Sequence, residues 1–209
     1  MSHTKDFDIK RNAILDCAEQ LFTVRGYEVT TVNTILKEVG IAKGTFYYYF
    51  TSKEEVMDAV IMRIIDTELE HAKEVLNNKK LTPIEKLITS LFRKSETVEK
   101  KVIIESLNEP NNALMKQRAL QRTLEVLCPI YAEMIIEGNR KQDFSSANPL
   151  EDIQFLVAGV QTIYDLSSIS DAKIEVNIEV VLNTFFHVLR IDESKNSKEQ
   201  VKLLLFQNM

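Results

Sequence analysis

Apolar side chains recur every three to four residues along most of the chain, which is the period of an α-helix. One short helix is predicted by apolar residues at the i, i+3, i+4 and i+7 positions of a single face: Val32, Ile35, Leu36 and Val39. Gly40 can adopt a positive φ and end this helix. A second short helix is expected over about residues 43–49, with Phe46 and Phe50 one turn apart as its buried side chains. Two such helices around a glycine turn predict a helix-turn-helix.

The flanking segments predict two longer helices that complete an N-terminal bundle. The first runs from about residue 7 to residue 25 and carries an apolar stripe of helical period: Ile14, Cys17, Ala18, Leu21 and Phe22. Ser52, three residues before Glu55, forms a capping-box signature that starts a fourth helix, which continues to about Asn77. Residues 77–80 are a polar break, so the fourth helix connects the bundle to the rest of the chain.

The remainder also predicts helices. Thr82, Pro83 and Glu85 form a cap-proline-acid start, and residues 148–151 repeat this pattern. Pro110 marks a break, and Pro129 falls inside a helical stretch over about residues 111–140, where we expect a kink. Strand alternation of useful length is absent, so the predicted fold is all-α, with about nine or ten helices.

The last two long helices, over about residues 150–169 and 172–190, are more apolar than a simple exposed amphipathic helix requires. Their apolar residues are Phe155, Leu156, Val157, Val160, Ile163 and Tyr164 on one, and Ile174, Val176, Ile178, Val180, Val181, Leu182, Phe185, Phe186, Val188 and Leu189 on the other. A helix that is apolar nearly all round is buried on more than one side. The second side can face the chain's own core or a second subunit. A helix-turn-helix usually reads two half-sites as a dimer, which favours a subunit interface with Phe155, Val181 and Phe185 as candidates.

Composition fits a cytoplasmic helical protein. The chain has 209 residues, 44% hydrophobic and 27% charged, with five glycines and no tryptophan, which favours long regular elements over a turn-rich β fold. Cys17 and Cys128 lie far apart and suggest neither a disulfide framework nor a metal site. The N-terminus is polar, so no signal peptide is expected, and no apolar run approaches the roughly 18 residues of a membrane helix. The net charge is −5, yet residues 1–53 carry seven basic and six acidic side chains, so the acidity lies elsewhere.

Residues 30–55, TTVNTILKEVGIAKGTFYYYFTSKEE, are the most informative segment for function. Adjacent tyrosines between two lysines are not typical of a buried face. Tyrosine hydroxyls and lysine ammonium groups donate to phosphate oxygens and base edges, and the second helix of a helix-turn-helix enters the DNA major groove. The hydroxyl of Thr31 can cap the helix that follows it, although Thr30 is an alternative cap.

This stretch resembles the DNA-binding domain of TetR-family transcriptional repressors over about residues 9–62. The matching motifs are Gly26-Tyr27, Thr30-Thr31-Val32, Val39-Gly40-Ile41-Ala42, Lys43-Gly44-Thr45-Phe46-Tyr47-Tyr48-Tyr49-Phe50 and Ser52-Lys53-Glu54. Three positions depart from the family pattern. Ala42 replaces a usual capping serine, Tyr49 replaces a common histidine and Thr34 replaces a common acidic residue. These changes affect operator preference more than DNA binding itself.

The resemblance implies a DNA-binding domain over residues 1–53, followed by a helical ligand-binding and dimerisation domain over residues 54–209. It implies a homodimeric repressor that binds a palindromic operator and is released by a small apolar inducer, with a four-helix interface from the last two long helices. The expected DNA contacts are Thr31, Lys43, Gly44, Thr45, Tyr47, Tyr48, Tyr49 and Lys53. Residues that could line the inducer pocket, or alternatively form plain core and surface, are Phe92, Leu107, Met115, Arg118, Gln121, Tyr131, Met134, Phe155, Gln161 and Tyr164.

Two other classes of function are weighed against this interpretation. An enzyme is not expected, because none of the three histidines lies at metal-ligand spacing and no phosphate-binding or nucleophile motif is present. No cofactor or metal is therefore expected. A helical interaction protein that does not bind ligand remains an alternative, and so does a transcriptional activator.

Overall fold

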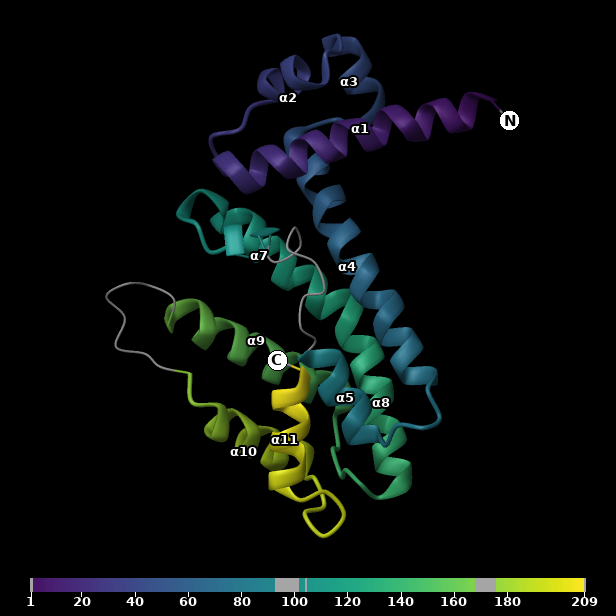
Figure 1. Cartoon of the computed structure of the whole chain (residues 1–209), viewed down its shortest axis with the longest axis vertical. Helices are drawn as coiled ribbons and strands as arrows, with labels where there is room; N and C mark the ends of the chain where they lie inside the picture. The colour runs from purple at the N-terminus through teal and green to yellow at the C-terminus, as the bar shows by residue number, and fades with distance from the viewer. Residues whose placement is uncertain (1, 93–101, 104, 168–175, 209) are drawn as a thin grey trace. The chain divides into compact units, whose positions relative to one another are not determined.

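The computed structural model describes residues 2–92, 102–103, 105–167 and 176–208, and this part of the chain contains helices and no strand (Figure 1). The chain divides into two compact units. The first comprises residues 1–64 together with residues 96–120, and the second comprises residues 65–95 and 121–209. Within the described residues, no helix is both long and apolar enough to cross a membrane.

The first unit is built on α1 (Ser2–Arg25), α2 (Val32–Val39), α3 (Lys43–Tyr49) and the beginning of α4 (Lys53–Asn77). A 3₁₀ turn, η1 (Pro110–Asn112), and most of α7 (Ala113–Arg122) belong to it as well. Fully buried side chains form its core: Ile14, Leu15, Ala18, Phe22, Ile35, Phe46, Phe50, Val56, Met57, Val60 and Ile61. The predicted burial of Phe46 and Phe50 is therefore confirmed.

Local capping determines where the short helices begin and end. Thr31 is the N-cap of α2 and accepts a hydrogen bond from the Thr34 N–H, while Gly40 ends α2 with φ of 74°. Ala42 precedes α3 without a side-chain cap, as the sequence predicts. The bounds of α2 and α3 match the prediction, whereas α1 begins at Ser2, earlier than predicted.

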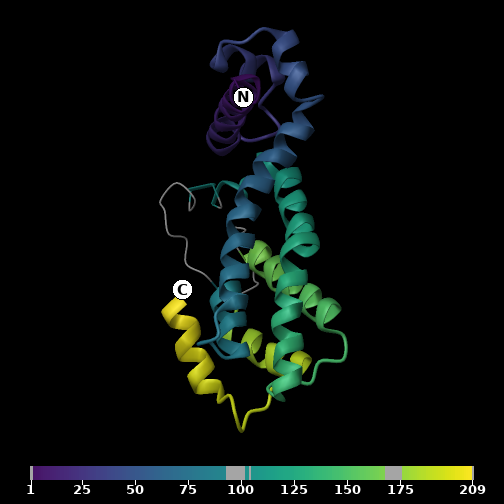
Figure 2. The same cartoon turned by 90° about the vertical axis from the view of Figure 1, so that its right-hand side faces the viewer.

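The second unit contains the rest of α4, α5 (Pro83–Leu91), α8 (Cys128–Lys141), α9 (Pro149–Ser167), α10 (Ile178–Leu189) and α11 (Lys198–Asn208). The helix α8 packs on α5 and α9, and α11 packs on α5 (Figure 2). Its deeply buried side chains include Leu87, Ile88, Cys128, Met134, Ile135, Ile153, Leu156 and Leu189. The α5 start has the full predicted capping box between Thr82 and Glu85.

A π-helical segment, η2 (Thr123–Leu127), precedes Pro129 at the start of α8. The predicted distortion therefore lies in the turn before the proline. Here the Cys128 N–H donates to the Thr123 carbonyl, five residues earlier. The Leu124 carbonyl accepts a hydrogen bond from the Gln154 side chain of α9 at 3.1 Å. The irregular turn thus gains a tertiary contact within the second unit.

Two C-terminal features differ from the prediction. The last apolar helix begins at Ile178 because the Asn177 side chain accepts from the N–H groups of Glu179 and Val180. The predicted start at residue 172, with Ile174, lies outside the described residues. The sequence interpretation also missed α11, although Ser197 and Gln200 have capping-box spacing and the Ser197 hydroxyl accepts from the Gln200 N–H.

The second unit contains a buried lysine. Lys86, which is 3% exposed, donates to the Leu76 carbonyl and to the Glu137 carboxylate, both at 2.7 Å. Partial burial acts to raise the pKa of Glu137, but hydrogen bonds from Lys141 and Lys86 outweigh it and hold the pKa below its usual value. This buried charge is therefore compensated by a carboxylate and a carbonyl.

The observed units differ from a division between residues 53 and 54. Residues 54–64 of α4 and the described residues 102–103 and 105–120 belong to the same unit as the helix-turn-helix. Asn112 provides a physical reason, because its buried amide is hydrogen-bonded to the main chain of Phe22 and Tyr27.

Candidate nucleic-acid interface

The helix α3 presents a solvent-exposed face of lysine and tyrosine. Tyr47 and Tyr48 are 48% and 69% exposed, whereas Phe46 on the inner face is fully buried. Lys43 and Tyr47 lie one turn apart, and the Lys43 ammonium is 5.9 Å from the centre of the Tyr47 ring. Gly44 is exposed and an added Cβ there would meet no atom within 4 Å. Donors and an aromatic surface are therefore available to a ligand along this face.

The N-terminus of α2 adds a second exposed donor group. Thr31 is exposed, and its hydroxyl lies 2.9 Å from the Thr34 hydroxyl. Thr30 is 1% exposed and donates inward to the Gly26 carbonyl at 2.7 Å. Of the two possible caps, Thr31 is the one that caps α2. Main-chain N–H groups at a helix N-terminus attract phosphate oxygens.

The remaining α3 side chains are less accessible. Tyr49 is half-buried, with its ring centre 4.7 Å from that of Phe7 in α1, and Thr45 is also half-buried. Tyr48 contacts the same Phe7 ring edge-on at 5.7 Å while remaining largely exposed. Phe7 thus packs the N-terminal part of α1 against the end of α3, and Tyr49 contributes packing as well as a hydroxyl.

The ammonium of Lys53 is bound to its own chain. It donates to the main-chain carbonyls of Tyr27 at 2.8 Å and Thr30 at 2.9 Å, and it lies 3.5 Å from that of Glu28. Burial lowers the pKa of Lys53, although Glu54 and Glu28 act against this shift. Lys53 therefore links the start of α4 to the turn between α1 and α2 through hydrogen bonds, a role that its sequence motif does not indicate.

Other side chains at the start of α4 complete this attachment. The Tyr27 hydroxyl donates to the Glu54 carboxylate at 3.3 Å, and burial together with this carboxylate raises the pKa of Tyr27 to about 12. The Ser52 hydroxyl accepts from the Glu55 N–H, and the Glu55 carboxylate accepts from the Thr51 N–H and hydroxyl. Hydrogen bonds from the Thr51 main chain and hydroxyl lower the pKa of Glu55.

Asn112, from η1, is a structural residue of this region that the sequence interpretation did not single out. It is fully buried, and its Oδ1 accepts from the Tyr27 N–H at 2.6 Å. A contact across 85 residues leaves no local sequence signal, and the Asn-Pro-rich segment around it indicates only a break between helices.

The ten predicted pocket residues do not come together within either unit. Leu107, Met115 and Arg118 belong to the first unit and the other seven to the second. Tyr131 and Met134 are buried in α8, and burial raises the pKa of Tyr131.

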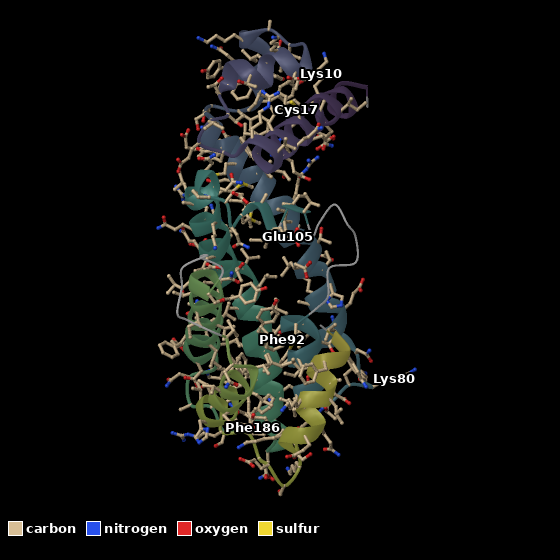
Figure 3. The ribbon with its side chains drawn as sticks, turned by 60° about the vertical axis from the view of Figure 1, so that its left-hand side comes forward. Lys10, Cys17, Lys80, Phe92, Glu105 and Phe186 are labelled. Atoms are coloured by element: carbon tan, nitrogen blue, oxygen red, sulfur yellow. The ribbon has the colours of Figure 1, made fainter. Side chains whose placement is uncertain are left out.

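Four of the other predicted pocket residues of the second unit are exposed: Gln121, Phe155, Gln161 and Tyr164. Phe155 is 72% exposed and Tyr164 is 57% exposed, so neither lines an enclosed cavity of its own chain. Gln121 and Gln161 are exposed and hydrogen-bonded to Glu125 and Asp165 of the next helical turn. The ring of Phe92, which is labelled in Figure 3, lies 6.2 Å from the ring of Phe185 in α10.

A cleft of about 360 Å³ does lie within the first unit, but none of the predicted pocket residues lines it. Its walls are the end of α1 and the segment leading to η1, with Arg25, Glu105 and Glu109 as its charged side chains. Among the described residues, no group of three histidine, cysteine, aspartate or glutamate side chains is arranged to hold a metal.

Sequence comparison identifies the helix-turn-helix. Residues 14–60 match the family model described as bacterial regulatory proteins, tetR family. The chain is 34% identical over 91 residues to the transcriptional repressor KstR2 of Mycolicibacterium smegmatis, a match covering 43% of each protein. It is 49% identical over 51 residues to an uncharacterised HTH-type regulator of Lactococcus lactis, covering 24% of this chain and 26% of that protein. These matches thus span less than half the length of either relative.

Solved structures resemble a larger part of the chain. The structure of SmeT, the repressor of a Stenotrophomonas maltophilia multidrug efflux pump, has a TM-score of 0.64 at 18% identity, covering 91% of this chain and 95% of SmeT. RolR in complex with resorcinol also has a TM-score of 0.64, at 17% identity, with 95% of each chain covered. At this identity the similarity concerns the fold. Residues 14–60 therefore match the TetR family of bacterial regulatory proteins, and the chain shares the fold of these solved structures over nearly its whole length.

Proposed function

We propose that the protein is a transcriptional repressor that binds a palindromic DNA operator as a homodimer and is released by a small apolar ligand. The observation that carries this proposal is the exposed face of Lys43, Gly44, Tyr47 and Tyr48 on α3. The buried side chain of Phe46 packs the opposite face of this helix into the core. Helix α3 enters the major groove, with Lys43 binding phosphate and Thr45 and Tyr48 reading base edges. The relatives named as repressors support this role.

DNA binding is tested by titrating labelled DNA from upstream of the protein's own gene, followed by fluorescence anisotropy at several salt concentrations. Specific binding retained in the presence of excess unrelated DNA is the expected result. Equal affinity for the upstream and the unrelated DNA would contradict sequence-specific regulation. A reporter gene behind the same DNA distinguishes a repressor from an activator, since only a repressor lowers expression.

Dimerisation is proposed through an exposed stripe on α9 together with the outer face of α10. Phe155 is 72% exposed, Ile163 43% and Leu166 41%, and Val180 on α10 is 58% exposed. Between the large residues lie Ala158, Gly159 and Thr162, whose small side chains allow a second helix to approach closely. A second copy of the chain is the partner because two half-sites of an operator require two recognition helices.

The stripe revises the choice of interface residues. Phe155 is a strong candidate, but Val181 and Phe185 are only 8% and 5% exposed in the single chain. We therefore propose that Val181 and Phe185 stabilise their own subunit, while Phe155 and Val180 contact the partner. Sedimentation at micromolar concentration tests the assembly, and a monomer would contradict both the dimer and the two-half-site mechanism.

The inducer is proposed to bind the second unit. RolR, which shares this fold, has been solved with resorcinol, a small aromatic molecule. The proposed ligand weakens operator binding by about 5–150-fold, which is the usual range of coupling between sites. A thermal-shift screen of small aromatic and aliphatic compounds, with operator titration for each stabilising compound, tests this step. Compounds that stabilise the protein and leave operator affinity unchanged would contradict the inducer mechanism without affecting DNA binding.

A further inference from the structure

Asn112 uses all the hydrogen-bonding groups of its amide inside the first unit. Its Oδ1 accepts from the Tyr27 N–H at 2.6 Å, and its Nδ2 donates to the carbonyls of Phe22 at 3.1 Å and Ser106 at 2.9 Å. The side chain is 0% exposed. An asparagine amide has two donor hydrogens and one acceptor oxygen, so each of its groups is engaged. The side chain therefore joins three main-chain segments of the first unit.

The backbone next to Asn112 makes a further hydrogen bond between η1 and the turn that joins α1 to α2. The Glu28 N–H donates to the Asn111 carbonyl at 3.0 Å. Gly26 has φ of 93°, and a Cβ at this position would overlap the Asn111 side chain. The turn between α1 and α2 therefore packs directly on η1, and glycine is required there both for its φ and for the close approach.

This turn leads directly into the N-terminus of α2. Thr30 donates back to the Gly26 carbonyl, and the next residue, Thr31, caps α2. Lys53 holds the turn from α4 through the Tyr27 and Thr30 carbonyls, while Asn112 holds it through the Tyr27 N–H. The first contact comes from within the N-terminal motif and the second comes from 85 residues further along the chain.

We propose that Asn112 is a positioning residue for DNA binding, acting by fixing the turn between α1 and α2 and thereby the N-terminus of α2. The inference rests on the proposed DNA-binding function. Asn112 is fully buried, so it touches no DNA itself. It is followed at once by α7, and therefore a segment outside the helix-turn-helix determines how the α2 N-terminus and Thr31 meet the phosphate backbone.

The test compares Asn112→Leu, which keeps a similar side-chain volume without hydrogen bonds, with Asn112→Ala. Asn111→Ala is the matched control, because it changes the same residue type in the same turn and retains the Cβ beside Gly26. Operator affinity is measured at a temperature where circular dichroism shows each variant to be folded. We expect both Asn112 variants to bind at least about tenfold more weakly, and Asn111→Ala to bind within about twofold of the wild type.

Two further readouts separate positioning from a general structural role. The slope of log affinity against log salt stays at the wild-type value, because no phosphate contact of a lysine is removed. A purely structural role would lower the melting temperature and leave the affinity of the folded variant unchanged, which would overturn the proposal. If neither variant folds, amide hydrogen exchange of the wild-type protein decides the matter.

In the wild-type protein, the proposal requires the Tyr27 and Glu28 amides to be protected from hydrogen exchange to the level of the α1 core. Exchange as fast as that of an exposed loop would overturn it. This measurement needs no DNA, so its failure is distinguishable from failure of the proposed function. A wild-type protein that binds no DNA would instead remove the proposed function itself.

Discussion

The ammonium of Lys53 donates to the main-chain carbonyl of Tyr27 at 2.8 Å and lies 4.1 Å from the centre of the Tyr27 ring. A lysine in this motif, next to the recognition helix, is predicted from sequence to contact DNA. The structure gives the ammonium partners in the turn between α1 and α2 instead. A DNA contact of Lys53 and its observed hydrogen bonds to the turn predict different effects of a Lys53 substitution on protein stability and on the salt dependence of binding.

We expect Lys53→Met to lower the free energy of unfolding by about 1–3 kcal/mol, because the Tyr27 and Thr30 carbonyls lose a charged donor. Operator affinity falls with it, while the salt dependence of binding stays close to that of the wild type. Urea unfolding and salt-dependent anisotropy measure the two effects. A stable variant with a reduced salt slope would indicate that Lys53 contacts phosphate directly.

Lys43→Ala is expected to weaken binding to all DNA sequences, because its ammonium is exposed on α3 and available to phosphate. The slope of log affinity against log salt falls by roughly 0.9 for each lost phosphate contact. Lys80→Ala is the control, since Lys80 is an exposed lysine in the turn between α4 and α5 (Figure 3). Equal salt slopes for the two variants would rule out the assigned recognition helix.

Phe155→Glu is expected to dissociate the proposed dimer, because an unpaired charge in a buried interface costs several kcal/mol. Tyr164→Glu is the matched control. Tyr164 is an exposed aromatic residue of the same helix, but nine residues later it faces the opposite side of α9. Sedimentation velocity should detect monomers only for Phe155→Glu. Dissociation by Tyr164→Glu alone would place the interface on the other face.

The Glu137 carboxylate gives the second unit a specific pH dependence. Its pKa in the folded protein lies below the ordinary value of 4.5, so its contribution to stability is present above that pH and is lost as the pH falls through the lower folded pKa. Glu137→Gln should cost about 1–3 kcal/mol at pH 7 and progressively less below pH 4.5. Denaturant unfolding between pH 7 and pH 3 measures this difference. Glu133→Gln, an exposed position on the same helix, is the control for replacing a glutamate of α8.

Two glycines should respond in opposite ways to alanine. At Gly138 an added Cβ would overlap the buried Phe144 ring, whereas at Gly159 no atom lies within 4 Å in the single chain. Gly138→Ala should destabilise the protein by about 1–3 kcal/mol. In the Phe155→Glu background, in which the proposed interface is disrupted, Gly159→Ala should be neutral or stabilise α9 by up to about 1 kcal/mol. Thermal unfolding of both variants checks the pair, and a tolerated Gly138→Ala would contradict the packing described for Phe144.

Features set by neighbouring residues were predictable from the sequence. The ends of α2 follow from Thr31 and Gly40, and the start of α5 follows from the Thr82 capping box, because each cap is a contact within a few residues. The exposed Tyr47 and Tyr48 and the buried Phe46 follow from helical periodicity in the same way.

Features set by distant residues were not predictable in this manner. Nothing near Lys53 in the sequence indicates that its ammonium binds the Thr30 carbonyl, 23 residues away. Asn112 has no local pattern that predicts burial. Phe155 and Phe185 are both phenylalanines in apolar helices, yet one is exposed and the other buried, since only the packing of α9 and α10 distinguishes their faces.

The discontinuous first unit bears on how such regulators can be recombined. A hybrid protein made by joining residues 1–53 to the ligand-binding part of another regulator would lack the native Asn112 and Asn111 partners of the Tyr27 and Glu28 amides. The transferred N-terminal helices would then carry main-chain N–H donors whose hydrogen-bond acceptors are present only in the original protein. Exchange of DNA specificity between relatives therefore requires that the η1 turn is transferred together with the N-terminal helices, so that both sequence segments of the first unit are exchanged.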